Sequence, residues 1–219
     1  MNKKIALLVS EGVDYKFLYE ELKKVYPCVD LFKSEFSHLR KDIVTPVHKL
    51  IVRNLSNKMS AEEGVENEND YVPFFSDKII VEMYDLLWKS NMKKNHEIKN
   101  NFTYDICINI NKRFDKLSID YQTELVEKLS KFKIKNSTIH ILETKGMITF
   151  PFHSIDYSMF CTDSISYDMM GTIYKNLPYM FAPHDYTHRV KNNLPIFKNN
   201  EEDIFYFYAA QFDFNLEAI

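Results

Sequence analysis

Carboxylates that follow predicted strands are the residues of this sequence best placed to do chemistry. Asp115 comes just after an apolar stretch at 104–111, and Asp156 follows a second such stretch at 148–152. Glu202 opens the last predicted helix. In an open α/β sheet, ligands bind beyond the carboxyl ends of the strands, and acidic side chains there can hold a divalent cation that neutralises a pyrophosphate leaving group. For each carboxylate taken alone, a loop residue or a helix cap is the simpler interpretation.

A pair of histidines suggests a different chemistry. On a helix, His184 and His188 would share one face, with Asp185 at the position of the general base of a zinc hydrolase. However, Pro183 and Pro195 bracket the stretch, and the sequence offers no third ligand at a fitting spacing. Histidines of a surface loop are therefore the favoured interpretation, and a metal hydrolase is the weaker hypothesis.

Glycine-rich phosphate cradles are missing. The four glycines, at 12, 64, 146 and 171, complete neither a GxGxxG nor a GxxxxGK[ST] motif, and there is no GxSxG elbow. Dinucleotide oxidoreductases of the usual type and P-loop enzymes are therefore poor candidates.

Composition narrows the class of protein further. The 219 residues carry 28 Lys and Arg against 31 Asp and Glu, a formal net charge of −3, which argues against a protein that binds nucleic acid through its phosphates. No apolar run approaches the ~20 residues of a membrane-spanning helix. The three cysteines, Cys28, Cys107 and Cys161, form no CxxC pair, which favours reduced, buried thiols. A soluble cytoplasmic protein (in the host cytoplasm if the source is viral) is therefore expected.

Hydrophobic periodicity predicts alternating strands and helices, and hence an α/β fold in a single domain over 1–219 with a mobile loop around 56–75. The predicted strands span 4–9, 28–32, 104–111, 138–142 and 148–152. The first predicted helix follows Asp14 and buries Phe17, Leu18, Leu22 and Val25. Four further helices are predicted: a short one at 48–55, a long one from Ser76, one from Tyr121 to Phe132, and one capped by Asp163 or Ser164. A last helix begins at Asn200, with Ile204, Phe205, Tyr208 and Phe212 inward.

The long helix has two distinct parts. Its first turns place Ile79, Ile80, Met83, Leu86 and Leu87 on one face, the pattern of a core-facing stripe. The charged run at 93–99 that follows is expected to be a solvated face.

Several stretches together resemble bacterial and viral glycosyltransferases of the GT-A type. The apolar strand and small-residue turn at 4–12, followed by 29–32, are similar to the start of that family. A stronger similarity covers 76–115, where a long helix leads into a strand that closes with Arg-Phe-Asp. The segments at 155–160 and 201–202 resemble two later acidic elements of the family. The resemblance implies a Rossmann-like, GT-A-type mixed sheet flanked by helices.

The resemblance also implies a nucleotide site at the end of the first strand. By position, Ser10, Glu11 and Gly12 would contact the nucleotide of a sugar-nucleotide donor. Asp115 would do the work of the family's metal-binding acid and hold a manganese or magnesium ion against the diphosphate.

The sequence departs from the family where two arginines would project from the central strand. It has Asn109 and Asn111 there, and Arg113 comes about two residues late. Asparagine can donate a hydrogen bond to a phosphate oxygen but brings no charge. Asn109, Asn111 and Arg113 are therefore candidates for diphosphate contacts. Either Arg113 restores one positive charge, or the site has lost its activity.

Two functions follow as hypotheses. The first is a metal-dependent glycosyltransferase that moves a hexose from a nucleotide sugar to a glycan or surface polymer, with Asp156 and Glu202 as catalytic candidates near the acceptor or sugar. The second is a catalytically inactive glycosyltransferase-like binding or structural module, of a virus or phage. The loss of the arginines and the aromatic stretch at 205–208 motivate the second hypothesis.

Overall fold

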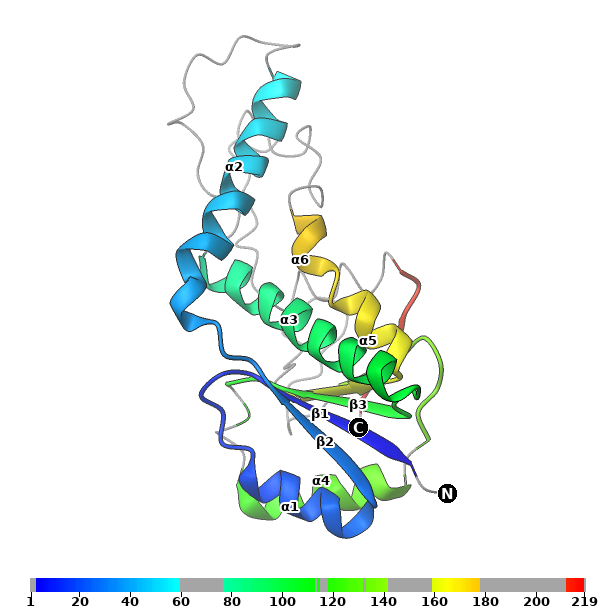
Figure 1. Cartoon of the computed structure of the whole chain (residues 1–219). Helices are drawn as coiled ribbons and strands as arrows, with labels where there is room; N and C mark the ends of the chain where they lie inside the picture. The colour runs from blue at the N-terminus through cyan, green and yellow to red at the C-terminus, as the bar shows by residue number, and fades with distance from the viewer. Residues whose placement is uncertain are drawn as a thin grey trace.

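The computed structural model describes residues 3–59, 77–112, 114, 118–131, 133–141, 159–177 and 212–218. Within these residues, six strands form one mixed sheet with helices on both faces, which confirms the predicted α/β class (Figure 1). The strands are β1 Lys4–Val9, β2 Cys28–Lys33, β3 Ile106–Ile110, β4 Thr138–Ile141, β5 Met159–Thr162 and β6 Asn215–Ala218. The helices are α1 Lys16–Val25, α2 Arg40–Met59, α3 Asp77–Asn100, α4 Ile119–Lys131, α5 Ser164–Met170 and α6 Ile173–Asn176, with a short 3-10 turn η1 at Ser37–Leu39.

The strand order is β2-β1-β3-β5-β4-β6. β1 pairs in parallel with β2 on one side and with β3 on the other, whereas β5 runs antiparallel to both β3 and β4. The chain therefore leaves β1 toward one edge of the sheet and returns on the other side of β1 as β3. This reversal of strand order makes the carboxyl ends of β1 and β3 a topological switch point.

Strands β1 and β3 form because their residues are apolar on both faces, as in a sheet covered by helices on both sides. Ile5, Leu7 and Val9 face one layer of core, and Ala6 and Leu8 face the other. Every residue of β3 is buried as well. β3 therefore lies centrally in the sheet, between β1 and β5.

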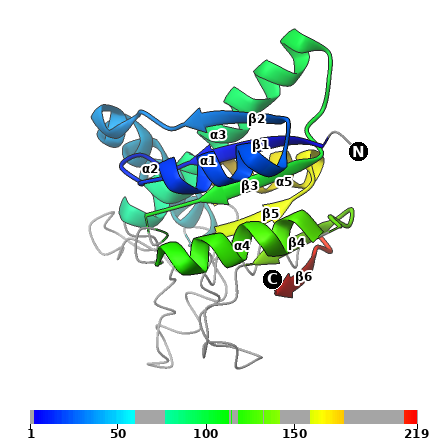
Figure 2. The same ribbon diagram turned by 90° about the horizontal axis from the view of Figure 1, so that it is seen from below.

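Helices cover the two faces unequally. α1 and α4 lie side by side under one face of the sheet, where Leu18, Leu22, Leu125 and Leu129 share one core (Figure 2). α2, α3, α5 and α6 lie over the other face, and α3 crosses it (Figure 1). The second core, between this helical layer and the sheet, is where the polar groups considered below are buried.

Most of the expected elements are present where the structure describes the chain. α1 ends where Tyr26 turns to extended backbone before Pro27, which disfavours helix in the residue preceding it. Val25, expected inward, is exposed, and Tyr26 is buried in its place, with Oη donating to the carbonyl of Leu129 at 2.8 Å. Asp163 caps α5 by accepting from the amide of Ser166 at 2.9 Å, as predicted.

Other expectations are corrected. α2 runs through Met59, so it is longer than the predicted 48–55 helix and includes the first residues of the loop expected at 56–75. β5 and β6 were not among the predicted strands. Phe212, expected inward on a last helix, lies in a turn and is exposed. The predicted strand at 148–152 and the helix residues at 200–211 lie outside the described residues.

Candidate functional site

The carboxyl ends of β1 and β3 form one polar edge. Ser10 directly follows β1, and its amide donates to the carbonyl of Ile110, the last residue of β3, at 3.0 Å. Asn111 follows β3, so it lies beside the turn that begins at Ser10. Gly12 in that turn has φ +80°, a conformation that favours glycine, and there is open space where a side chain would be. The structure thus brings three predicted positions, Ser10, Gly12 and Asn111, to the switch point.

Behind this edge lies a buried ion pair on α3. Lys89 is fully buried, and its Nζ lies 2.5 Å from Oδ2 of Asp85. Ser10 joins the pair: its Oγ donates to the same Oδ2 at 2.5 Å and accepts from Lys89 at 3.0 Å. Burial lowers the pKa of Lys89, and the charge and hydrogen bond of Asp85 oppose that shift. α3 is therefore tied to the end of β1 by a three-residue polar cluster.

One carboxylate oxygen of this cluster receives no hydrogen bond from the described residues. Oδ1 of Asp85 is buried, and no residue within the described ranges donates a hydrogen bond to it. A buried acceptor without a donor is costly and uncommon in native proteins.

Asn109 extends the cluster across the sheet. It is buried near the end of β3, and its Oδ1 accepts from Oη of Tyr167 on α5 at 3.0 Å. Burial, with the nearby carboxylate of Asp85, raises the pKa of Tyr167, so the phenol keeps the proton that it donates. The side-chain oxygen of Asn109 therefore takes part in a hydrogen bond within the fold.

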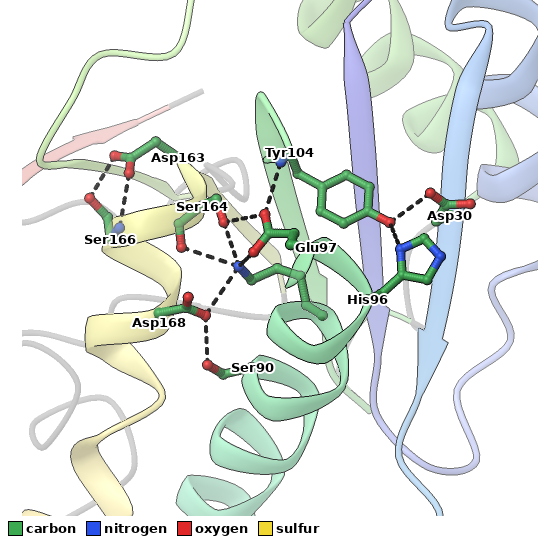
Figure 3. A network of polar contacts seen from close by, with 10 residues as sticks. Asp30, Ser90, His96, Glu97, Tyr104, Asp163, Ser164, Ser166 and Asp168 are labelled. Carbon is green, nitrogen blue, oxygen red and sulfur yellow. Dashed lines mark hydrogen bonds and ion pairs between the residues drawn. The ribbon is translucent and has the colours of Figure 1, made fainter. Parts of the chain in front are cut away.

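A second buried cluster lies at the other end of the central strands, near the amino end of β3. Glu97, Ser164 and Asp168 converge there (Figure 3). Lys93, fully buried on α3, lies 2.8 Å from Oε2 of Glu97 and 3.1 Å from Oδ1 of Asp168, and it also donates to the Ser164 hydroxyl. Burial acts to lower the pKa of Lys93, but its neighbours Cys107, Glu97 and Asp168 outweigh that effect and raise it.

Glu97 is the centre of this second cluster. Besides Lys93, its carboxylate accepts from the Ser164 hydroxyl at 2.6 Å and from the amide of Tyr104 at 2.8 Å. Burial acts to raise the pKa of Glu97, and these hydrogen bonds outweigh it, so the pKa is lowered. The charged run at 93–99 is thus only partly a solvated face. Lys94, Ile98 and Lys99 are exposed as expected, but Lys93 and Glu97 are buried.

Close to Glu97, the side chain of Tyr104 connects α3 to β2 through hydrogen bonds to one residue of each. Oη of Tyr104 donates to Oδ2 of Asp30 at 2.6 Å and lies 2.8 Å from Nδ1 of His96 (Figure 3). Burial, reinforced by the hydrogen bond to Asp30, raises the pKa of Tyr104. Because the phenol has one proton and gives it to Asp30, Nδ1 of His96 must be the donor to Oη.

An open groove of about 880 Å³ lies over the second cluster, between the last turns of α3 and the length of α5. Ile98 and Ile165, both about 70% exposed, line it together with Glu97, Ser164 and Asp168. Of the predicted site residues that the structure describes, none lines this groove.

The other predicted site residues are either in the turn after β1 or outside the described residues. Glu11 is half-buried in the turn after β1, and Gly12 is exposed. The rest lie outside the described residues: Arg113, Asp115, Asp156, Glu202, His184 and His188. Within the described part of the chain, no three His, Cys, Asp or Glu side chains are grouped as a metal site would require.

The sequence reasoning missed Asp85, Lys89 and Tyr167. The spacing of the core stripe held no signal for Asp85 or Lys89, but it did indicate buried polar residues further along α3. Ile79, Met83 and Leu86 are separated by four and three residues, and the same steps lead on to the buried polar residues Ser90, Lys93 and Glu97. The stripe thus continues to face the core after its residue types become polar.

Comparison with protein-family models, with curated proteins and with solved structures gave no match for this chain. Among the helices that the structure describes, none is long and apolar enough to cross a membrane.

Proposed function

We propose that this chain is a glycosyltransferase that moves a sugar from a nucleotide-sugar donor to a glycan or surface-polymer acceptor. The observation that supports this proposal most is the reversal of strand order at β1 and β3. Ligands of open α/β sheets bind outside the carboxyl ends of the strands at such a point. Ser10, Gly12 and Asn111 meet there, and the chain continues from β3 directly toward Asp115.

The residues at this edge suit a nucleotide in complementary ways. The open space at Gly12 lets a ligand approach the backbone closely. Asn111 can donate a hydrogen bond to a phosphate oxygen. Asp115 is the proposed ligand of a manganese or magnesium ion, which would supply positive charge to the departing nucleoside diphosphate. Asp156 and Glu202 remain the proposed catalytic residues at the acceptor or sugar.

The test is a melting-temperature screen of the full chain with nucleoside diphosphates and their sugars, each with and without manganese. A ligand at ~100 times its dissociation constant adds about 2.7 kcal/mol to stability, and the melting temperature should rise accordingly. We expect one base to give a manganese-dependent rise. Asp115→Asn should abolish the manganese dependence. Asp105→Asn is the matched control, because Asp105 precedes β3, is exposed and accepts from the amide of Lys4.

A non-catalytic module is the second candidate. It is favoured because two predicted ligand-binding side chains make hydrogen bonds within the fold. Ser10 bonds to Asp85 and Lys89, and Asn109 bonds to Tyr167. This candidate predicts that no nucleotide or nucleotide sugar raises the melting temperature.

A further inference from the structure

The groove between α3 and α5 has apolar side chains on both of its walls. Ile98 on α3 is 70% exposed and Ile165 on α5 is 71% exposed, and both line the groove. Phe102 and Met169, which are partly buried against the core, line it as well. Exposed apolar side chains that are grouped beside a groove, rather than scattered singly, are suited to burial against another molecule.

The two walls of this groove also carry opposite charges. On the α3 wall Lys94 is exposed, and no carboxylate of the described residues forms an ion pair with it. On the α5 wall Asp168 keeps 23% of its side-chain surface exposed. Both groups are therefore within reach of a molecule that binds in the groove.

The charge of Asp168 is only partly balanced inside the fold. Its Oδ1 lies 3.1 Å from Nζ of Lys93 and accepts from the Ser90 hydroxyl at 2.7 Å (Figure 3). Lys93 also pairs with Glu97 at 2.8 Å, so one buried ammonium group serves two carboxylates and one negative charge is left over. That excess is most accessible at Asp168, because the side chain of Glu97 is only 10% exposed.

Such a groove is complementary to itself. In a contact with twofold symmetry, a residue i of one copy meets a residue j of the other copy, and the reverse contact occurs as well. If the groove of one copy faces that of a second copy, Lys94 of each copy meets Asp168 of the other, and Ile98 and Ile165 are buried between them. A second copy thus brings both charges and the apolar side chains that this surface requires.

We infer that the groove between α3 and α5 is the contact surface of a symmetric dimer of this chain. Burial of Ile98 and Ile165 supplies the attraction, and ion pairs between Lys94 and Asp168 of different copies fix the orientation. The switch point at the carboxyl ends of β1 and β3 lies at the other end of the central strands, so the dimer leaves it open. The inference therefore does not rest on the proposed function.

The test measures the dissociation constant of the dimer by sedimentation equilibrium of the full chain, at concentrations up to about 0.5 mM. We expect the wild-type chain to show a monomer–dimer equilibrium. Ile165→Asp should raise the dissociation constant by about tenfold or more, because it buries an unpaired carboxylate in the contact. Ile119→Asp is the matched control and should leave the constant unchanged, because Ile119 is 61% exposed but begins α4, on the other face of the sheet.

The ion pairs are tested separately from the apolar contact. Lys94→Glu places like charges opposite each other and should also weaken the dimer, whereas Lys131→Glu, at the exposed end of α4, should not. In an Asp168→Asn background the repulsion is gone, so Lys94→Glu should have a much smaller effect there. Asp168→Asn leaves Lys93 paired with Glu97, and melting temperatures check that each variant is folded.

Three outcomes would overturn the dimer. The first is a wild-type chain that stays monomeric at every concentration, which would leave the groove to a partner other than a second copy. The second is a dimer whose dissociation constant is the same in wild type, Ile165→Asp and Lys94→Glu, because it would use another surface. The third is an equal effect of Lys94→Glu with and without Asp168, which would refute the pairing that defines the symmetric contact.

Discussion

Lys89 and Lys93 lie one turn apart on α3, both fully buried, and their counter-ions lie in opposite directions along the helix. Lys89 pairs with Asp85, four residues before it, and Lys93 pairs with Glu97, four residues after it. The four residues form a charged row along a face of α3 that is buried in the fold. One end of the row is tied to Ser10 after β1, and the other to Ser164 of α5. The row therefore fixes where α3 crosses the sheet, and with it the carboxyl edge of β1.

Breaking the Asp85–Lys89 pair should be costly, and removing both charges should cost less than the sum of the single changes. Asp85→Asn alone leaves a buried ammonium group without its counter-ion, for which a loss of about 3–5 kcal/mol in the free energy of unfolding is expected. Urea unfolding of both single variants and of Asp85→Asn/Lys89→Met measures the coupling. The exposed i,i+4 pair Glu124–Lys128, at 3.5 Å, is the control and should couple by less than ~0.5 kcal/mol. Equal coupling in the two pairs would contradict the buried row.

The contribution of Glu97 should depend on pH in a defined direction. Because hydrogen bonds from Lys93, Ser164 and Tyr104 lower its pKa in the folded state, the unfolded chain binds more protons in acid, and stability falls as the pH falls. The stabilisation is complete above the ordinary glutamate pKa of about 4.3 and is lost below it. The difference in unfolding free energy between wild type and Glu97→Gln should therefore shrink in acid. A difference that stays constant from neutral pH into acid would show that the pKa of Glu97 is unshifted.

Gly171 should be intolerant of any side chain, for reasons of packing. A Cβ at this position would lie 2.7 Å from Cβ and 3.0 Å from Oγ of Ser90, so α5 would have to move away from α3. Gly171→Ala should cost about 1–3 kcal/mol and lower the melting temperature. In a Ser90→Gly background, which removes both contacted atoms, the same substitution should cost much less. An equal cost in both backgrounds would mean that the clash is not the cause.

The sequence predicted the parallel core of this fold well. β1, β2, β3 and α4 are continuous apolar runs or amphipathic stretches, and their local pattern matches their burial. β5 and β6 are only four residues long, and β5 directly precedes the Asp163 cap, so the helix signal was recognised and the strand was not. Short strands such as β5, inside the sheet, and β6, at its edge, gain their stability from neighbours distant in sequence, which a local pattern does not contain.

The site was harder to predict than the fold. The switch point could be anticipated, because Ser10 and Asn111 follow apolar strands. The buried charges could not be assigned from composition, since Lys93 and Glu97 stand among exposed neighbours such as Lys94 and Lys99. Tertiary contacts with α5 and with the residue after β1 offset the desolvation cost of burying these charges, and a local sequence pattern does not contain those contacts.

Asn109 and Asn111, equivalent in the sequence argument, should behave differently when changed. Asn109 is 1% exposed and accepts from Tyr167, so Asn109→Ala leaves a buried phenol without an acceptor and should cost about 1–3 kcal/mol of stability. Asn111 lies beyond the end of β3 and is half-buried, so Asn111→Ala should weaken nucleotide binding and lower the melting temperature less than Asn109→Ala does. Thermal unfolding and titration calorimetry on both variants check this. A pair of variants with the same profile would contradict the distinction.

The most direct test of the nucleotide site at the carboxyl edge of β1 and β3 is amide hydrogen exchange with and without the nucleoside diphosphate and manganese. If the nucleotide binds at this edge, exchange should slow at Glu11, Gly12 and Asn111 and stay unchanged at 94–104, beside the groove between α3 and α5. Protection confined to 94–104, or no change anywhere at saturating nucleotide, would contradict a nucleotide site at the carboxyl ends of β1 and β3.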